Sequence, residues 1–503
     1  MTDRDVFTTE TDGLPESSRT RLLRLRDGDR LDLRVSPVRT DLNGAHLRML
    51  AYNGSIPGPT LHVDQGSKVI VRTRNDGDVE TTVHWHGLRL ENRYDGVPHE
   101  TQMPIPIGGS YTCTVQFPDA GFYWYHPHLR EDFAQEMGLY GSIIVEPQDP
   151  EYWPAADRAL ALTLDDLLVE DGHIAPFRQS GPNYTAMGRF GNEVLINGSS
   201  TFADEARAGE VVRLYLVNTA NTRIFNFAVR GARAKLIGGD SGRYEHETLV
   251  EEVLLAPSER AVVDVLFDAP GKVRLEHRTP DRVYDLGAFD VTAREGSVTA
   301  AAATFEQLRT DPTLSTERAL MAQALDRTPD KVLGFFSRMP LLSGNEASDH
   351  DHNHNHNHAH EQGDGLEWED LMPEMNRASD PSNMIWQLID RETGAVNGGI
   401  DWAFTVGERI KIRLVNETDS DHPMHHPFHI HGAGRFLILS RGGEPEPNLV
   451  WKDTVLVRAG QTVDILLEVS NPGRWMAHCH IAEHAESGMM FSFNVARKPE
   501  PAH

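Results

Sequence analysis

The sequence has few cysteines, no long apolar run and far fewer basic than acidic side chains. Only Cys113 and Cys479 occur among 503 residues, so cysteine usage does not settle the compartment of the protein. No run of about 18 apolar residues exists, and we therefore expect no membrane span. The formal net charge is −27, which argues on electrostatic grounds against nucleic acid or an anionic membrane as a partner.

The composition is that of a globular protein with several cores. Hydrophobic residues make up 39% of the chain, and at this length the prior is about three domains. Residues 1–20 are polar and lack the apolar core of a signal peptide. The sequence as it stands predicts a cytoplasmic monomer, or a periplasmic or secreted protein if a leader has been removed.

The most informative stretch is His478-Cys479-His480, followed by His484 and Met489. In a β-strand, successive side chains point to opposite faces. Cys479 then points one way and its two histidine neighbours the other, which places two metal centres one residue apart. Cys479, His484 and Met489 are the thiolate, imidazole and weak axial thioether that a blue-copper site needs.

The second histidine of that site is expected from the segment 426–432. His426 has strand parity opposite to that of His429 and His431, so it can turn towards Cys479. The pair at 429 and 431 is one of four His-x-His motifs, which lie far apart in the chain. Such a set predicts a second, histidine-only metal site; the four motifs are His84–His86, His126–His128, His429–His431 and His478–His480.

A repeated unit occurs three times. Residues 66–76, 209–219 and 407–417 each begin with a turn glycine and continue with β-branched alternation, which is a strand signal. Each is followed by a strand ending in glycine and by a Gly-led strand. In the middle copy the histidine positions hold other residues, namely Ala228, Arg230, Glu276 and Arg278. The outer copies are therefore expected to share one metal cluster, with the middle copy as a spacer.

Many short strands with Gly and Pro turns predict an all-β chain of three consecutive Greek-key β-sandwiches. We expect the first domain at residues 1–150 and the second at 151–298. A linker is expected at 299–365, weakly helical over 300–324, and the third domain at 366–503.

With these motifs the chain resembles the three-domain multicopper oxidases, which include laccases and the cuprous oxidases. The resemblance covers nearly the whole chain except residues 300–365. It implies cupredoxin-like domains and four copper ions: one type 1, one type 2 and two type 3. It also implies oxidation of a donor at the type 1 copper, coupled to reduction of dioxygen to water at a trinuclear cluster.

The resemblance also assigns ligands, and no position of the pattern is missing. The type 1 copper would take His426, Cys479, His484 and Met489, and the type 2 copper would take His84 and His429. The type 3 pair would take six histidines: His86, His126, His128, His431, His478 and His480.

Two acids are candidate catalytic residues beside Cys479. Asp453 resembles a family aspartate and is expected to orient His426; the alternative is a surface acid at a strand end. Asp95 matches a family aspartate near the type 2 copper; the alternative is an ordinary turn residue. Related bacterial enzymes carry a proton-delivering glutamate after the distal type 1 histidine, where this chain has Ala485. Glu486 has the opposite strand parity, so Asp95 is expected to supply protons or turnover to be slow.

Residues 349–360 carry six histidines at alternate positions. Two interpretations are open for this segment: it gathers copper, or it is a polar linker that binds metal only adventitiously. Three methionines follow, at Met372, Met375 and Met384, and core packing is favoured over a role as soft ligands.

The predicted function is oxidation of phenols or aryl amines with dioxygen, as in laccases. The alternative is a metallo-oxidase acting on ions such as Cu(I), with the histidine-rich segment gathering metal. A copper nitrite reductase fits the doubled His-Cys-His arrangement poorly. A copper-free structural relative is disfavoured because all ligand positions are intact, and copper storage remains as a side activity.

Overall fold

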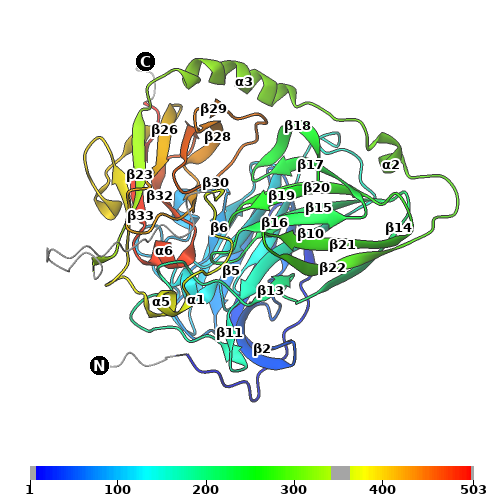
Figure 1. Ribbon diagram of the computed structural model, residues 1–503, viewed down its shortest axis with the longest axis horizontal. Coiled ribbons are helices and arrows are strands. Elements are labelled where there is room, and N and C mark those ends of the chain that lie inside the picture. The colour runs from blue at the N-terminus through cyan, green and yellow to red at the C-terminus, as the bar shows by residue number, and fades with distance from the viewer. Residues whose placement is uncertain (1–6, 341–362, 500–503) are drawn as a thin grey trace, which may run out of the picture.

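The structure, a computed structural model, describes residues 7–340 and 363–499, so the histidine-rich segment 349–360 lies outside the described residues. Strands dominate, which confirms the all-β prediction, and six of the seven sheets form three sandwiches in chain order. Figure 1 shows the first sandwich in blue and cyan, the second in green and the third in yellow to red.

The first sandwich packs a four-stranded sheet on a five-stranded sheet. The four-stranded sheet has the order β3 (Ala45–Tyr52), β2 (Arg30–Leu42), β5 (Lys68–Asn75) and β7 (Ser110–Gln116). The five-stranded sheet has the order β1 (Leu22–Leu25), β4 (Thr60–Asp64), β9 (Gly141–Glu146), β8 (Gly121–His126) and β6 (His84–His86).

The second sandwich follows the same plan with more strands. Its larger sheet has the order β13 (Glu193–Ile196), β10 (Arg158–Leu167), β15 (Val211–Asn218), β20 (Arg260–Leu266), β17 (Arg233–Gly239) and β18 (Gly242–Val250). The other sheet has the order β14 (Phe202–Arg207), β22 (Val283–Thr292), β21 (Gly271–Arg278), β16 (Phe225–Arg230) and β19 (Glu252–Leu255). A separate ribbon pairs β11 (Val169–Glu170) with β12 (His173–Ile174).

The third sandwich begins earlier than predicted. Its larger sheet has the order β24 (Ile385–Asp390), β23 (Lys331–Arg338), β26 (Arg409–Asn416), β31 (Thr462–Val469), β28 (Gly434–Arg441) and β29 (Glu444–Pro445). The other has the order β25 (Ala403–Thr405), β33 (Met490–Ala496), β32 (Gly473–Cys479), β27 (His426–Ile430) and β30 (Thr454–Val457). Because β23 pairs with β26, the segment expected to be linker up to residue 365 already contributes a strand to this sandwich.

Helices are short and mostly join sandwiches. The expected helical linker is formed by α2 (Ala300–Thr304) and α3 (Pro312–Leu325), and Figure 1 shows α3 crossing from the second to the third sandwich. The others lie near the site described below: η1 (Asn92–Tyr94), α1 (Glu131–Ala134), α5 (Pro373–Ala378), η2 (Asn397–Gly399) and α6 (Ala482–Glu486).

The three copies of the repeated unit have the same local structure. The leading glycines Gly66, Gly209 and Gly407 all have positive φ, at 88°, 76° and 99°, which favours glycine. The strands that follow, β5, β15 and β26, each pair in parallel with a preceding strand and antiparallel with a later one. The repeat seen in the sequence is therefore a repeat of topology.

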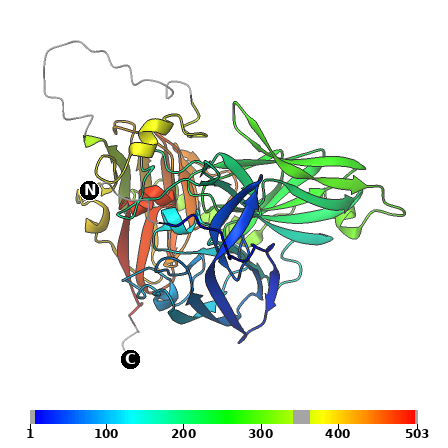
Figure 2. The same cartoon turned by 90° about the horizontal axis from the view of Figure 1, so that it is seen from below.

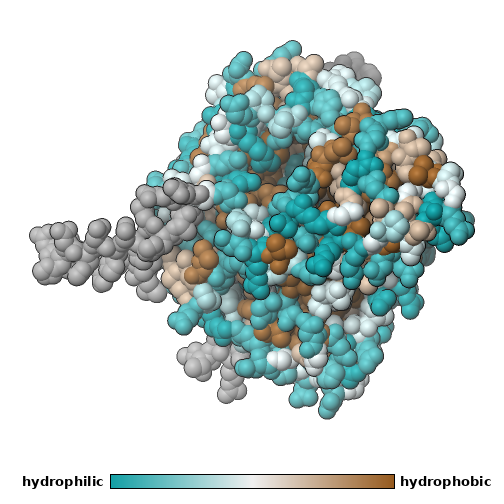
Figure 3. Space-filling view, turned by 45° about the vertical axis from the view of Figure 1, so that its right-hand side comes forward, coloured by the Kyte–Doolittle hydropathy of each residue, from teal (hydrophilic) through white to brown (hydrophobic). Residues whose placement is uncertain are grey.

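The sandwiches meet so that the first and third lie against each other and the second lies beside both (Figures 1 and 2). Each has its own hydrophobic core. The face in Figure 3 is largely hydrophilic with scattered apolar groups, as expected for a chain of net charge −27. Among residues 7–340 and 363–499, no helix is long and apolar enough to cross a membrane.

Candidate metal centres

The four His-x-His motifs converge between the first and third sandwiches. Residues two apart on a strand share a face, and β6 pairs with β8 as β27 pairs with β32. All eight histidines are buried, with no side chain more than 5% exposed. Their ligand atoms form three groups within 4.8 Å: His84, His86 and His429; His86, His126 and His480; His128, His431 and His478.

The third of these groups places three ring nitrogens face to face. Nε2 of His431 lies 3.2 Å from Nε2 of His128 and 3.1 Å from Nε2 of His478. The three Nδ1 atoms contact a carboxylate of Glu131 at 2.9 Å, a carboxylate of Asp95 at 2.8 Å and the Cys479 carbonyl at 2.8 Å. These acceptors require the hydrogen on Nδ1, so lone pairs converge at Nε2. A bound cation satisfies such an arrangement.

Three of the remaining histidines follow the same pattern. His84, His126 and His429 each donate from Nδ1 to a backbone carbonyl at 2.7–2.9 Å. Their Nε2 atoms, and both ring nitrogens of His480, are buried without a hydrogen-bond partner among the described residues. A buried, unpaired polar atom costs about 1–3 kcal/mol, and metal coordination removes that cost. The geometry therefore fits a cluster of imidazole-bound ions.

Burial keeps six of the eight rings neutral, as metal ligands must be, whereas the pKa of His128 is raised by the Glu131 carboxylate beside it. Burial lowers the pKa of His478 well below its usual value and that of His431 to about 3. Neighbouring histidines add to the effect, because a second imidazolium nearby is repelled. These six rings are thus in the neutral form that binds a metal at neutral pH.

A second candidate centre lies in the core of the third sandwich. Sγ of Cys479 is 3.4 Å from Nδ1 of His426 and 3.8 Å from Nδ1 of His484. Met489 is fully buried, and its carbonyl accepts the Cys479 N–H at 3.1 Å. Burial raises the pKa of the Cys479 thiol, so a bound cation is needed to hold the thiolate. Two imidazoles and one thiolate form the trigonal set of a blue-copper site.

Strand alternation links the two centres. Cys479 faces the third-sandwich core, while His478 and His480 face the histidine cluster. Likewise His426 and His429, three residues apart on β27, serve opposite faces. Strand parity in the sequence predicted both arrangements: Cys479 and His426 on one face, and the histidines of the cluster on the other.

Asp453 does not lie where the sequence analysis placed it. We expected it to orient His426, but its Oδ1 accepts Nε2–H of His86 at 3.0 Å and its carbonyl accepts from His429. The reason is strand register: His429 lies opposite Thr454, whereas His426 lies opposite Val457, three residues further along. Asp453 is 2% exposed, so the alternative of a surface acid is also wrong.

Asp95 lies beside His84, as expected. Its carbonyl accepts Nδ1–H of His84, and its carboxylate accepts Nδ1–H of His431 at 2.8 Å. The two histidines favour the ionised form, which lowers the pKa of this fully buried acid. Asp95 therefore fixes two rings of the cluster.

Glu486 lies in helix α6, residues 482–486, so strand parity does not apply to it and the prediction made from parity was wrong. The Glu486 carboxylate accepts the Glu131 N–H at 2.9 Å, and Glu131 accepts from His128. Burial and the carboxylates of Asp132 and Glu131 raise the pKa of Glu486. Glu131 was not predicted from the sequence, because it lies at the start of helix α1 while His128 lies in the bend before it, so no helical periodicity links them.

The outer face of the Cys479 centre is covered. Trp386 stacks on His484 with ring centroids 4.0 Å apart, and His484 has no exposed surface. Next to Trp386 lies His422, whose Nε2 is 3.1 Å from Sδ of Met187. Met384 is buried in the core and Met372 packs against it, as favoured from the sequence, but Met375 is 39% exposed, so core packing is wrong for that residue.

Residues 34–150 and 372–499 each match the sequence profile of a multicopper oxidase domain. The chain belongs to the multicopper oxidase family. It is therefore a copper-dependent oxidoreductase with dioxygen as acceptor, and its three sandwiches are cupredoxin-like.

Relatives of this multicopper oxidase differ in their described activities. It is 25% identical to a multicopper oxidase of Staphylococcus epidermidis, over 89% of this chain and 83% of that protein. It is 26% identical to laccase-1 of Botryotinia fuckeliana, over 90% and 79%. The structure of a Campylobacter jejuni multicopper oxidase, described as a metallo-oxidase, matches with a TM-score of 0.69 at 22% identity, covering 98% of this chain and 99% of that one. That structural match concerns the fold alone.

Proposed function

We propose that this multicopper oxidase takes electrons from a reduced metal ion of the Cu(I) type. In this proposal four coppers are held: type 1 by His426, Cys479, His484 and Met489; type 2 by His84 and His429; and type 3 by the other six histidines of the cluster. When bound, the coppers would store single electrons until four are available to reduce dioxygen to water.

The observation that carries the donor class is the cover over His484. A phenol delivers an electron best when its ring lies against an exposed imidazole of the type 1 site. Here that imidazole has no exposed surface, and the face of its ring is stacked on Trp386, itself 1% exposed. A small ion needs less room than an aromatic ring, so burial favours the metal donor.

Two soft metal-ligand side chains, His422 and Met187, lie beside Trp386. The imidazole of His422 and the thioether of Met187 are in contact, and both are ligand types that suit Cu(I). Trp386 lies next to both His422 and His484, with ring centroids 6.1 Å and 4.0 Å away. A cation held at the pair would thus be one aromatic ring away from the type 1 site.

The surrounding charge favours a cation as well. Asp419 and Asp421 precede His422 and are exposed, and Asp421 accepts the Met339 N–H at 2.7 Å. The whole chain carries −27, so its field attracts cations and repels anions. This charge supports delivery of a metal ion to the surface beside His422.

Protons for water formation need their own route. Glu486 is half-buried in α6 and accepts the backbone N–H of Glu131, whose carboxylate accepts from His128. The backbone N–H relays no proton, but the two carboxylates interact electrostatically and therefore lie near each other. The proposal is that protons pass between them from the surface to the histidine cluster, in place of the glutamate that related enzymes carry at position 485.

Aromatic donors, which the sequence analysis favoured, remain the second candidate. Leu371 and Met375 are 65% and 39% exposed, next to or within helix α5. That helix contacts the same cover, since Asn376 accepts the Met187 N–H at 3.0 Å. An apolar surface at this place is suited to a phenol ring, and the laccase relative is consistent with such a donor.

The test is oxygen uptake by the copper-loaded protein with Cu(I) and with a simple phenol, measured side by side. We expect Cu(I) to be turned over faster. Met187→Leu keeps the side-chain volume but removes the thioether, and it should lower kcat/KM for Cu(I) about 10-fold with little effect on the phenol. Met321→Leu, a buried methionine in α3, is the matched control. Faster phenol oxidation, unaffected by Met187→Leu, would overturn the metal-donor proposal.

A further inference from the structure

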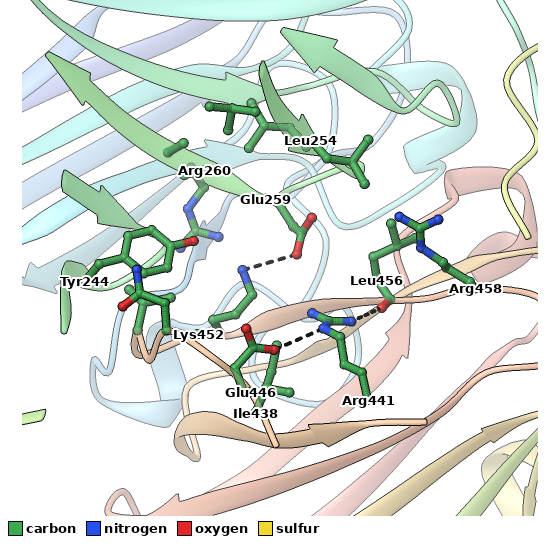
Figure 4. A pocket seen from close by; sticks show the side chains of 15 residues that line it. Tyr244, Leu254, Glu259, Arg260, Ile438, Arg441, Glu446, Lys452, Leu456 and Arg458 are labelled. Carbon is green, nitrogen blue, oxygen red and sulfur yellow. Dashed lines mark hydrogen bonds and ion pairs between the residues drawn. The ribbon is translucent and has the colours of Figure 1, made fainter. Parts of the chain in front are cut away.

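The middle sandwich holds none of the proposed copper ligands, but it reaches the histidine cluster through one buried arginine. Arg260, the first residue of β20, lies at the inner end of an interdomain cavity of about 260 Å³ (Figure 4). The cavity lies between β18–β20 of the second sandwich and β28–β30 of the third. Tyr244, Glu259, Arg441 and Lys452 line it, and Lys452 pairs with Glu259 at 3.1 Å.

All hydrogen-bonding groups of the Arg260 guanidinium are used, and they join three sandwiches. Nε donates to the Phe122 carbonyl of the first sandwich at 3.0 Å, and Nη1 donates to the Ser258 carbonyl of the second at 2.9 Å. Nη1 and Nη2 also donate to the two carboxylate oxygens of Asp453 in the third sandwich, with Nη1 at 2.7 Å from Oδ1. Such a fork fixes the carboxylate plane as well as its position.

The opposite side of Asp453 faces the histidines. Oδ1, the atom that Arg260 holds, also accepts Nε2–H of His86. Thr454 donates its hydroxyl to the same oxygen at 2.9 Å, and the Asp453 carbonyl accepts from His429. One carboxylate and its backbone thus orient one ring from each of two sandwiches.

Close packing shows how tightly this arrangement is defined. Gly87 follows His86 with φ of +83°, and a Cβ atom there would lie 2.5 Å from Oδ2 of Asp453 and 2.8 Å from Nη2 of Arg260. The glycine that ends the His84-Trp-His86-Gly87 strand is thereby accounted for, because the ion pair occupies the space of a side chain.

We infer that Arg260 of the middle sandwich is a positioning residue for the copper cluster, acting through Asp453 on His86 and His429. The inference rests on the proposed assignment of these histidines as type 3 and type 2 ligands. Without the guanidinium, Asp453 would be a buried carboxylate with one side unpaired. It would then turn towards water in the adjoining cavity and release the His86 ring. The middle domain therefore does more than separate the outer two.

The experiment compares copper-loaded wild-type protein with Arg260→Gln, Arg260→Lys and the control Arg213→Gln. Arg213 is a matched control because it forms a fork with Asp264 at 2.8 and 2.9 Å, is also buried in the same sandwich and contacts no copper ligand among the described residues. The readouts are copper per chain, the type 2 electron paramagnetic resonance spectrum and copper loss to a competing chelator.

For Arg260→Gln we expect about 10- to 100-fold weaker retention of trinuclear copper and an altered type 2 spectrum. The blue type 1 colour should remain, because Arg260 does not touch that centre. Arg260→Lys, which keeps the charge but not the fork, should fall in between. Arg213→Gln should lower the melting temperature without changing the spectrum.

Asp453→Asn provides a second route if Arg260→Gln does not fold. It should give the same copper loss, and combining it with Arg260→Gln should add little, because both act on one contact. Unchanged copper affinity and spectrum in Arg260→Gln, or equal losses in Arg213→Gln, would overturn the inference. A wild-type protein that binds only the type 1 copper would instead overturn the ligand assignment.

Discussion

The tight packing at Gly87 gives a quantitative prediction. Replacing Gly87 by alanine forces a non-glycine residue into φ of +83°, which costs roughly 1–2 kcal/mol. The new Cβ would also meet Asp453 at 2.5 Å, Arg260 at 2.8 Å and Tyr123 at 3.0 Å. These are buried groups that cannot swing into solvent, so overpacking adds about 1–3 kcal/mol.

Gly28 separates the two contributions. It has the same φ of +83°, but nothing lies within 4 Å of its hypothetical Cβ. Gly28→Ala therefore has only the backbone cost, and the difference between the variants is the overpacking cost. At roughly 2–4 °C per kcal/mol, the apparent melting temperatures should differ by several degrees, with Gly87→Ala the lower.

Calorimetry of the copper-free proteins measures this difference, and copper per chain gives an independent readout. Displacing Asp453 loosens His86, so Gly87→Ala should also retain less trinuclear copper, whereas Gly28→Ala should match wild type. Equal melting temperatures and equal copper contents in the two variants would refute the packing argument.

Three other predictions follow from the two centres. Cys479→Ser should remove the blue colour and donor oxidation and leave three coppers in place of four, as measured by absorbance and elemental analysis; retained colour would contradict the assignment of the thiolate. Glu486→Gln should slow reoxidation by dioxygen about 100-fold in stopped flow, because it removes a proton carrier. Anaerobic reduction of the blue centre should keep its rate, because electron uptake is a separate step. Unaltered reoxidation would exclude Glu486 from the proton route. The copper-free protein should lose stability as pH falls from about 7 towards 5. The reason is that histidines of the unfolded chain bind protons near pH 6.5, whereas buried His431 has a pKa of about 3. Urea midpoints that stay constant over this pH range would contradict the prediction.

Much of the fold was predictable because its signals are local. Turn glycines at 66, 209 and 407 and the alternation after them depend only on neighbouring residues. The early start of the third sandwich at β23 was missed for the opposite reason. That strand is recognised by its pairing with β26, about eighty residues further along the chain.

The candidate site divides in the same way. Parity along a strand decides that Cys479 points away from His478 and His480, so the sequence alone separated the two metal centres. It misjudged Glu486, because a helix replaces the strand there and parity no longer applies. Register, which a single strand does not contain, moved Asp453 from His426 to His86 and His429.

The sequence by itself therefore determined the number of sandwiches and which side chains can share a face, since strand periodicity is a property of the local backbone. Only the tertiary structure decided which faces meet. The contact between Arg260 and Asp453 spans 193 residues and joins the second sandwich to the third, and the group of His84, His86 and His429 joins the first to the third. Contacts of this kind arise when separate sandwiches pack together, and no local pattern encodes them.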